Sequence, residues 1–264
     1  MDDIAYQEYP EQPNTAPPPE PLLHTGISGF DELFDSGGIP QGNSILLAGG
    51  AGTGKSLFCR NLCYNLASQG RHCMYVSFEE TIERIVRSMT EMGWDIQQYI
   101  DNGTFLIQKV NPLDILRMKF GSLGGSGSAT ELSYKVKPLI IPKGFNPEVI
   151  VVDSLTAIIA ASISKEKNYR VYLQQLFSFF EETGSTSFLI SETEPIPERY
   201  SQSGIEEFLA DGIIVFYNIK RSDHRENAVE VVKMRYSHHK KTIVGMEIQP
   251  SGIIIHPDQH VSIE

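Results

Sequence analysis

Short apolar runs alternate with amphipathic segments along the first three quarters of the chain. Consecutive apolar residues are typical of strands that are covered on both faces of a parallel sheet. The strands predicted in this way are Ser44–Ala48, Cys73–Phe78, Thr104–Val110, Val149–Val152 and Ser187–Ile190. Helical spacing of apolar residues predicts helices over about Lys55–Gln69, from after Glu80 to about Met92, and over about Lys165–Glu182. This alternation predicts right-handed βαβ units, and hence an α/β fold with a mostly parallel sheet flanked by helices.

The pattern changes after Asp211, where strands follow one another without helices between them. The predicted strands of this part are Gly212–Ile219, Ala228–Arg235, Ile243–Ile248 and Ile253–His256. Short connections of this kind favour antiparallel pairing. We therefore expect C-terminal antiparallel strands added to the parallel sheet.

The length of 264 residues, with 41% apolar and 21% charged residues, suits one large α/β domain, which we place at residues 22–257. Residues 1–21 carry six prolines, several acids and neither Lys nor Arg, so we predict a disordered acidic tail there. Residues 258–264 are expected to form a short C-terminal tail. The run Gly121–Ser128 consists mostly of Gly and Ser and predicts a loop.

Several classes of protein are disfavoured by composition. The chain begins without the basic and apolar regions of a signal peptide, and it has no run of the roughly 18 to 20 apolar residues that span a membrane, so we expect a cytoplasmic location. The net charge of −11 argues against generic binding to nucleic acid.

Cys59, Cys63 and Cys73 make a poor disulfide framework. Cys59 and Cys63 lie one helical turn apart, a spacing that suits a metal, but no further His or Cys completes a ligand set. We expect buried thiols.

Residues 49–56 match the phosphate-binding pattern G-x-x-x-x-G-K-[ST], and they lie between a predicted strand and a predicted helix, as that pattern requires. Glycines let main-chain N–H groups turn toward phosphates, and the helix that follows presents its positive end to the same anions. The alternative is a glycine-rich turn with a purely structural role. We expect ATP to contact Gly49, Gly50, Ala51, Gly52, Thr53, Gly54, Lys55, Ser56 and Leu57, with Lys55 on the β- and γ-phosphates.

Ser56 and Asp153 are the candidate ligands of Mg²⁺. Asp153 follows the predicted strand Val149–Val152, and ligands of parallel α/β sheets bind outside the carboxyl ends of the strands. The hydroxyl of Ser56 and the carboxylate of Asp153 would then open onto one crevice. The alternative role of Asp153 is a helix cap.

Glu79 and Glu80 follow the second predicted strand and are candidates for orienting the water that attacks the γ-phosphate. The alternative is an acidic first turn of the next helix, which the helix dipole favours. The residues themselves leave both interpretations open.

Three motifs resemble those of the KaiC family of RecA-like P-loop ATPases. Thr25–Leu33, followed by Gly37-Gly38-Ile39-Pro40, resembles the segment that precedes the P-loop in that family, and Ser77–Glu80 resembles its paired glutamates. The resemblance covers about Leu22 to His256. It implies a RecA-like core, Mg-ATP hydrolysis with Glu79 and Glu80 as catalytic acids, and a homo-oligomer, expected from the family to be a hexameric ring.

The third motif is Val231–Arg235 with Ser237 and His239. By resemblance, Lys233 and Arg235 reach the γ-phosphate bound to a neighbouring subunit, where a cation stabilises transition-state charge. Alternate residues of a strand share one face, so both cations would point the same way. The alternative is an exposed basic strand edge that discourages aggregation.

Two departures limit the resemblance. Kinase-active members carry adjacent Ser and Thr acceptors where this chain has Ile205–Asp211 with Glu206 and Glu207, so we expect no autophosphorylation there; a fixed negative charge could imitate a phosphorylated acceptor. Clock proteins of the family also contain two such domains in tandem, whereas this sequence contains one. A clock function therefore does not follow.

We predict an ATP-hydrolysing ring with a regulatory or signal-transduction role and a regulatory protein partner that the sequence does not identify. A DNA recombination or repair ATPase is an alternative, since RecA-like folds serve both functions. Residues 192–211, where a DNA-contacting loop would lie, carry six acids and one base, which disfavours it. A second alternative is a nucleotide-sensing adaptor with little turnover, as in archaellum-motor relatives.

Overall fold

The computed structural model describes residues 21–117, 139–161 and 166–263. Nearly all of the predicted tail 1–21 and the whole of the predicted loop Gly121–Ser128 lie outside these residues. The structural findings below concern the described part of the chain.

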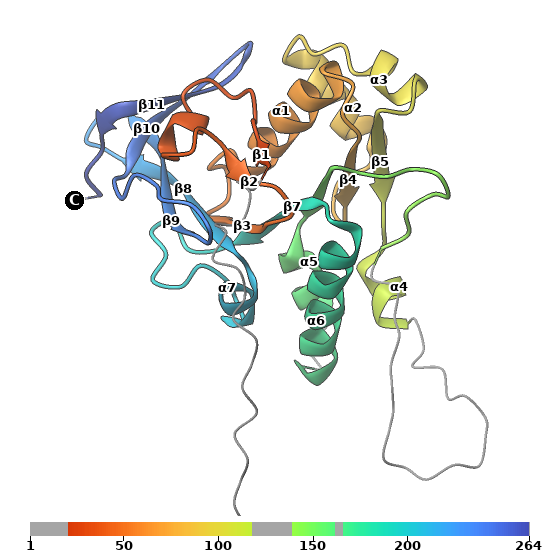
Figure 1. Cartoon of the computed structure of the whole chain (residues 1–264). Helices are drawn as coiled ribbons and strands as arrows, with labels where there is room; N and C mark the ends of the chain where they lie inside the picture. The colour runs from red at the N-terminus through yellow and green to blue at the C-terminus, as the bar shows by residue number, and fades with distance from the viewer. Residues whose placement is uncertain (1–20, 118–138, 162–165, 264) are drawn as a thin grey trace, which may run out of the picture.

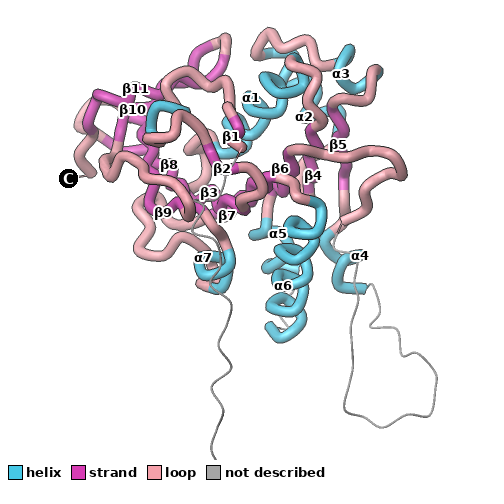
Figure 2. Tube along the Cα trace, in the orientation of Figure 1, coloured by secondary structure: helices cyan, strands magenta, loops and turns pink. Residues whose placement is uncertain are grey.

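A nine-stranded sheet of order β11-β10-β9-β8-β3-β7-β6-β4-β5 forms the centre of the molecule (Figures 1 and 2). Six neighbouring strands, from β8 to β5, run parallel to one another. Their bounds are β3 Ser44–Gly49, β4 Cys73–Ser77, β5 Phe105–Lys109, β6 Val149–Asp153, β7 Thr186–Glu192 and β8 Gly212–Lys220. The predicted α/β class with a mostly parallel sheet is confirmed.

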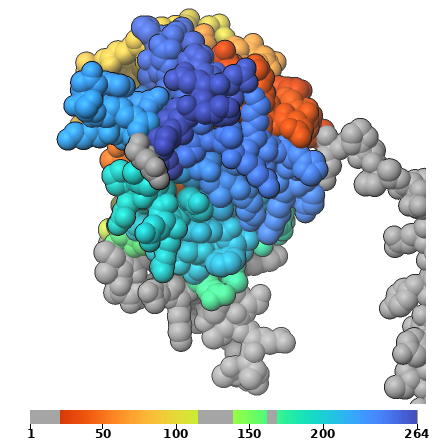
Figure 3. Space-filling model, turned by 90° about the vertical axis from the view of Figure 1, so that its left-hand side faces the viewer, coloured from red at the N-terminus to blue at the C-terminus, as the bar shows by residue number. Residues whose placement is uncertain are grey.

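Three further strands extend the sheet beyond β8 in antiparallel order, as predicted. They are β9 Arg225–Met234, β10 Val244–Gln249 and β11 Gly252–His260. In Figure 3 these strands, drawn in blue, cover much of one side of the molecule. β11 is longer than predicted and includes Asp258–His260, which we expected to begin the C-terminal tail. A separate pair, β1 Leu22–Leu23 and β2 Ile39–Pro40, was not predicted.

Helices cover both faces of the sheet (Figure 1). The helices are η1 Asp31–Leu33, α1 Lys55–Ser68, α2 Ile82–Glu91, α3 Gln97–Asp101, α4 Pro112–Arg117, α5 Leu155–Ala161, α6 Glu166–Thr183 and α7 Ile205–Leu209. The predicted helices correspond to α1, α2 and α6. α1 packs with the first hydrophobic core, and α5 and α6 pack with the second core on the opposite face.

Alternating side chains of the central strands supply these two cores. In β3, Ile45 and Leu47 enter the first core, whereas Leu46 and Ala48 enter the second, and all four are fully buried. Both faces of a central strand are therefore apolar, which explains why the sequence shows continuous hydrophobic runs. The carboxyl ends of six parallel strands consequently meet at one edge of a rigid sheet.

Cys59, Cys63 and Cys73 are buried and form no disulfide, as predicted. Among the described residues, no helix combines the length and the apolar character needed to cross a bilayer.

Candidate active site

The glycine-rich loop connects the end of β3 to the first residue of α1. Gly52 and Gly54 have φ angles of 75° and 95°, in the left-handed region that favours glycine. At Gly49 a Cβ atom would lie 2.3 Å from the carbonyl oxygen of Phe216 in β8. Glycine at these positions lets the loop curve tightly against the sheet.

Lys55 is buried at the start of α1. Its Nζ atom donates to the carbonyl oxygens of Gly49 and Gly50, both at 2.7 Å. Burial lowers the pKa of Lys55, whereas the nearby carboxylates of Glu192, Asp153 and Glu79 raise it. The ammonium group is thus held within the loop and surrounded by acids.

Asp153 ends β6 and accepts a hydrogen bond from the hydroxyl group of Tyr75. Burial raises the pKa of Asp153, and the nearby hydroxyl groups of Tyr75 and Ser56 lower it. α5 begins at Leu155, two residues after Asp153, and the Asp153 carboxylate contacts Tyr75 of β4. The structure therefore places the two predicted magnesium ligands next to each other.

Glu79 and Glu80 precede α2 and lie outside its first turn, since Thr81 is the N-cap and accepts a hydrogen bond from the N–H of Arg84. Their carboxylates have different partners. Ser154 donates from Oγ to Oε1 of Glu79 at 2.8 Å, and Arg60 forms an ion pair with Glu80. The alternative of an acidic first helical turn does not describe these positions.

One cleft of about 540 Å³ brings most of the predicted site residues together. It is lined by Gly52–Leu57 of the loop and helix, by Glu79 and Glu80, and by Asp153. Gly49, Gly50 and Ala51 do not line the cleft. The carbonyl oxygens of Gly49 and Gly50 instead accept hydrogen bonds from Nζ of Lys55. The structure thus collects, from three separate parts of the sequence, the groups expected to contact phosphate, metal and water.

The cleft lining also includes seven residues that were not predicted as site residues, namely Arg60, Ser77, Ser88, Glu91, Met92, Ile190 and, at the end of β7, Glu192. Glu192 could have been found, because it ends a parallel strand at the same edge as Asp153. Arg60 gave only a weak signal, because it is one cation in the middle of a mostly buried helix.

The donor chemistry fits a magnesium ion. Among the described residues there is no group of three or more His, Cys, Asp or Glu side chains arranged to hold a metal ion. A hydroxyl and one carboxylate suffice for Mg²⁺ in such sites, since the ion keeps several waters and binds substrate phosphates.

The cleft lining carries five acids, Glu79, Glu80, Glu91, Asp153 and Glu192, against Lys55 and Arg60, so a polyphosphate there needs cationic compensation.

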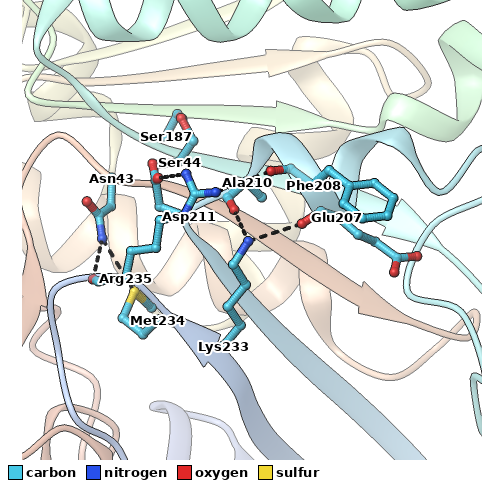
Figure 4. Close-up of polar contacts among 10 residues, drawn as sticks. All are labelled: Asn43, Ser44, Ser187, Glu207, Phe208, Ala210, Asp211, Lys233, Met234 and Arg235. Atoms are coloured by element: carbon cyan, nitrogen blue, oxygen red, sulfur yellow. Dashed lines mark hydrogen bonds and ion pairs between the residues drawn. The ribbon is translucent and has the colours of Figure 1, made fainter.

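Lys233 and Arg235 do not line this cleft. The Nζ atom of Lys233 donates to the carbonyl oxygens of Ala210 at 2.6 Å and Glu207 at 3.2 Å, and Arg235 forms an ion pair with Asp211 at 2.9 Å (Figure 4). Both cations face the segment between α7 and β8. Arg235 lies one residue beyond β9, so the shared direction does not come from strand alternation alone.

The alternative of a basic strand edge fits only in part. β9 lies between β8 and β10, but β10 pairs only with Asn227–Val229, so the end that carries Lys233 has a neighbour on one side. Arg235 keeps 47% of its side chain exposed. The guanidinium is therefore accessible from outside the chain while it remains bonded to Asp211.

Comparison with known proteins agrees with this geometry. The family model described as "ATPase: KaiC" matches residues 23–260. The circadian clock protein KaiC3 of Synechocystis sp. is 30% identical over 243 residues, which cover 92% of this chain and 47% of that protein. The circadian clock oscillator protein KaiC of Parathermosynechococcus lividus is 28% identical over 242 residues, which cover 90% of this chain and 42% of that protein. The chain thus spans less than half the length of both relatives.

A solved structure matches over nearly the whole described fold. The crystal structure of a KaiC-like protein from the hyperthermophile Pyrococcus horikoshii OT3 superposes with a TM-score of 0.73 and 31% sequence identity. The match covers 90% of this chain and 100% of that one.

Proposed function

Because the chain belongs to the KaiC ATPase family, we propose that it binds Mg-ATP and hydrolyses it. The observation that carries the proposal is the single cleft in which the glycine-rich loop, Asp153 and the two glutamates meet. None of these groups would be sufficient for phosphoryl transfer by itself. Their convergence at the carboxyl edge of the parallel sheet is the arrangement that the reaction requires.

The chain's own residues have separate tasks in this proposal. Main-chain amides of the loop and the first turn of α1 bind the phosphates, and Lys55 exchanges its two carbonyl partners for phosphate oxygens. Ser56 and Asp153 hold Mg²⁺, which neutralises charge that develops on the transferring phosphoryl group. Glu79 and Glu80 orient the attacking water and accept its proton.

Lys233 and Arg235 act on the γ-phosphate of a neighbouring copy. Their position outside their own chain's cleft supports this role, because a cation that serves a neighbour has to be accessible at the surface. A homo-oligomer follows from the proposal, and by relation to the family we expect a ring. Changes of shape in such a ring during ATP turnover would supply a regulatory or signalling output.

We expect no autophosphorylation at α7. The residues Ile205–Asp211 contain neither Ser nor Thr. Glu206 is fully buried, and Glu207 accepts hydrogen bonds from Tyr200 and Ser201. The two carboxylates therefore support the fold of this segment.

Sizing of the protein with and without Mg-ATP, while phosphate release is followed, tests the proposal. We expect assembly with Mg-ATP together with steady turnover. Nucleotide binding without turnover would support a nucleotide-sensing adaptor instead. Turnover that rises with single-stranded DNA, with binding that weakens steeply with salt, would support a DNA-dependent ATPase.

A further inference from the structure

Arg60 is a buried cation in the wall of the cleft and belongs to none of the three family-like motifs. Only 7% of its side chain is exposed. It donates from Nη1 to Oγ of Ser88 in α2 at 2.9 Å, and its other terminal nitrogen pairs with Glu80. A buried guanidinium is tolerated only when it is paired, so this side chain has to keep its partners close.

Arg60 also lies over the ring of Tyr75, with 5.8 Å between its Cζ atom and the ring centroid. Tyr75 is fully buried, and its hydroxyl donates to the carboxylate of Asp153. One guanidinium thus touches the carboxylate of Glu80 and the side chain that orients the predicted magnesium ligand. Glu80 and Asp153 are thus connected through Arg60 and Tyr75.

The two glutamates differ in how firmly they are held. The N–H of Glu80 donates to Oγ of Ser77 at 2.9 Å, and that hydroxyl donates to the carbonyl oxygen of Glu80 at 3.0 Å. With its carboxylate bound to Arg60, Glu80 is fixed through both main chain and side chain. Glu79 is exposed and meets the hydroxyl of Ser154, the residue after Asp153. A carboxylate whose oxygen is already bound to a guanidinium is less available to a water molecule than one that is exposed to solvent.

We propose that Arg60 is a positioning residue for hydrolysis: it fixes Glu80 and supports the Tyr75–Asp153 contact, which leaves Glu79 as the carboxylate that orients water. This proposal rests on the proposed ATPase function. It assigns a role to a residue that acts through its neighbours Glu80 and Tyr75.

The test compares Arg60→Met, Arg60→Lys, Glu80→Gln and the double variant Arg60→Met/Glu80→Gln with the wild-type chain. Turnover of Mg-ATP gives kcat and KM, and titration with ADP, in Mg²⁺ or in EDTA, gives affinity apart from activity. We expect Arg60→Met and Glu80→Gln each to lower kcat about 10- to 100-fold, because small displacements of catalytic groups have effects of that size. The double variant should be no slower than the slower single variant, since both changes disrupt one unit.

The affinity for ADP distinguishes a positioning role of Arg60 from a general disruption of the fold. ADP affinity in EDTA should stay within about threefold of wild type, whereas the gain in affinity from Mg²⁺ should fall severalfold in Arg60→Met, because Asp153 loses its support. Arg60→Lys should recover part of kcat. The matched control is Arg71→Met, which breaks an ion pair with Glu148 at the opposite, amino-terminal edge of the sheet and should change none of these values.

Wild-type kcat in Arg60→Met would overturn the proposal, as would a double variant whose loss is the product of the two single losses. Equal loss of ADP affinity with and without Mg²⁺ would also overturn it, because it indicates a merely structural role. A wild-type chain without turnover would refute the proposed ATPase function itself, whatever the variants do.

Discussion

Tyr75 donates its hydroxyl hydrogen to the carboxylate of Asp153 across two neighbouring strands. β4 and β6 are paired in register, with Ser77 opposite Asp153, so the tyrosine ring reaches the acid from two residues earlier in its own strand. Burial nevertheless raises the pKa of Asp153. Burial thus disfavours the charged form of this carboxyl group, and the hydrogen bond from Tyr75 offsets only part of that effect.

Asp153→Asn should make the protein more stable without ligand and less able to use magnesium. Removal of a desolvated charge raises the free energy of unfolding by about 1 kcal/mol at pH 7. Thermal melting with and without Mg-ATP measures both effects. The Mg²⁺-dependent shift in Tm should disappear, whereas the exposed control Asp95→Asn should keep it. An Asp153→Asn protein that melts lower and still gains stability from magnesium would refute the assigned ligand.

Lys55→Ala should abolish ATP binding. Loss of a charged donor to phosphate weakens binding by about 3 kcal/mol, or about 100-fold in Kd. It also leaves the carbonyl oxygens of Gly49 and Gly50 without this donor, so a lower Tm should accompany the loss. Calorimetric titration measures the affinity. The exposed Lys143→Ala serves as control and should bind as wild type; undiminished affinity in Lys55→Ala would remove the basis of the proposed site.

Arg235→Ala should retain ATP binding, and its turnover should be roughly 10³-fold slower. This is the size of the rate enhancement that a cation supplied by a neighbouring subunit gives in phosphoryl transfer. A mixture of Arg235→Ala and Lys55→Ala chains provides the sharper measurement. The first chain keeps an intact cleft and the second keeps Arg235, so some interfaces in mixed assemblies are complete and turnover should partly return. Mixtures that are no more active than the separate variants would contradict action between copies.

Gly49→Ala should destabilise the fold far more than Gly37→Ala. Both glycines have positive φ angles, 146° and 77°. At Gly49 the added Cβ meets the Phe216 carbonyl at 2.3 Å, whereas at Gly37 nothing lies within 4 Å. We expect a loss of about 1 kcal/mol at Gly37, from backbone strain alone, and at least about 3 kcal/mol at Gly49. Denaturant unfolding of both variants measures this, and equal losses would show that the close approach to β8 is unimportant.

Tyr169→Phe should show a pH-dependent loss of stability. Tyr169 is buried in α6 and donates to Oε1 of Glu206 at 2.6 Å. Burial, with a smaller contribution from the Glu206 charge, raises the pKa of Tyr169. The folded state then keeps a proton that the unfolded state releases above about pH 10, so this contribution to stability is complete below about pH 10 and declines above it.

At pH 8 the variant should be about 1–3 kcal/mol less stable than wild type, because the buried Glu206 loses a donor. Between about pH 10 and 11 the difference should shrink by about 1 kcal/mol, since only the wild type loses the titrating group. Tyr172→Phe is the control: within the described part of the chain its buried hydroxyl has no hydrogen-bond partner, so its removal should be tolerated at pH 8. A difference for Tyr169→Phe that stays constant with pH would contradict the raised pKa.

The strands of the core were predictable because both of their faces are buried, which leaves continuous apolar runs such as Val149–Val152. The helices α3, α4, α5 and α7 were missed. Each spans five to seven residues, less than two turns, so the spacing of apolar residues has no room to repeat.

The site was predictable where chemistry follows local sequence, as in the loop that ends at Lys55 and Ser56. It was not predictable where a partner comes from elsewhere. The pairing of Arg60 with Glu80 joins residues twenty positions apart, and the contacts of Lys233 with Glu207 and Ala210 depend on how β9 meets the end of α7. Such contacts are set by tertiary packing, and neither partner signals the other in the sequence.

The two carbonyl oxygens that hold the ammonium of Lys55 have a consequence for how strongly nucleotide can bind. An incoming phosphate replaces bonds that already exist, so the affinity reflects the difference between two hydrogen-bonded arrangements and is smaller than a count of new contacts suggests. The same internal bonds keep the glycine turn closed in advance, which reduces the disorder lost when ligand arrives. Modest affinity of this kind would suit the proposed ATPase function, in which the product has to leave after each cycle.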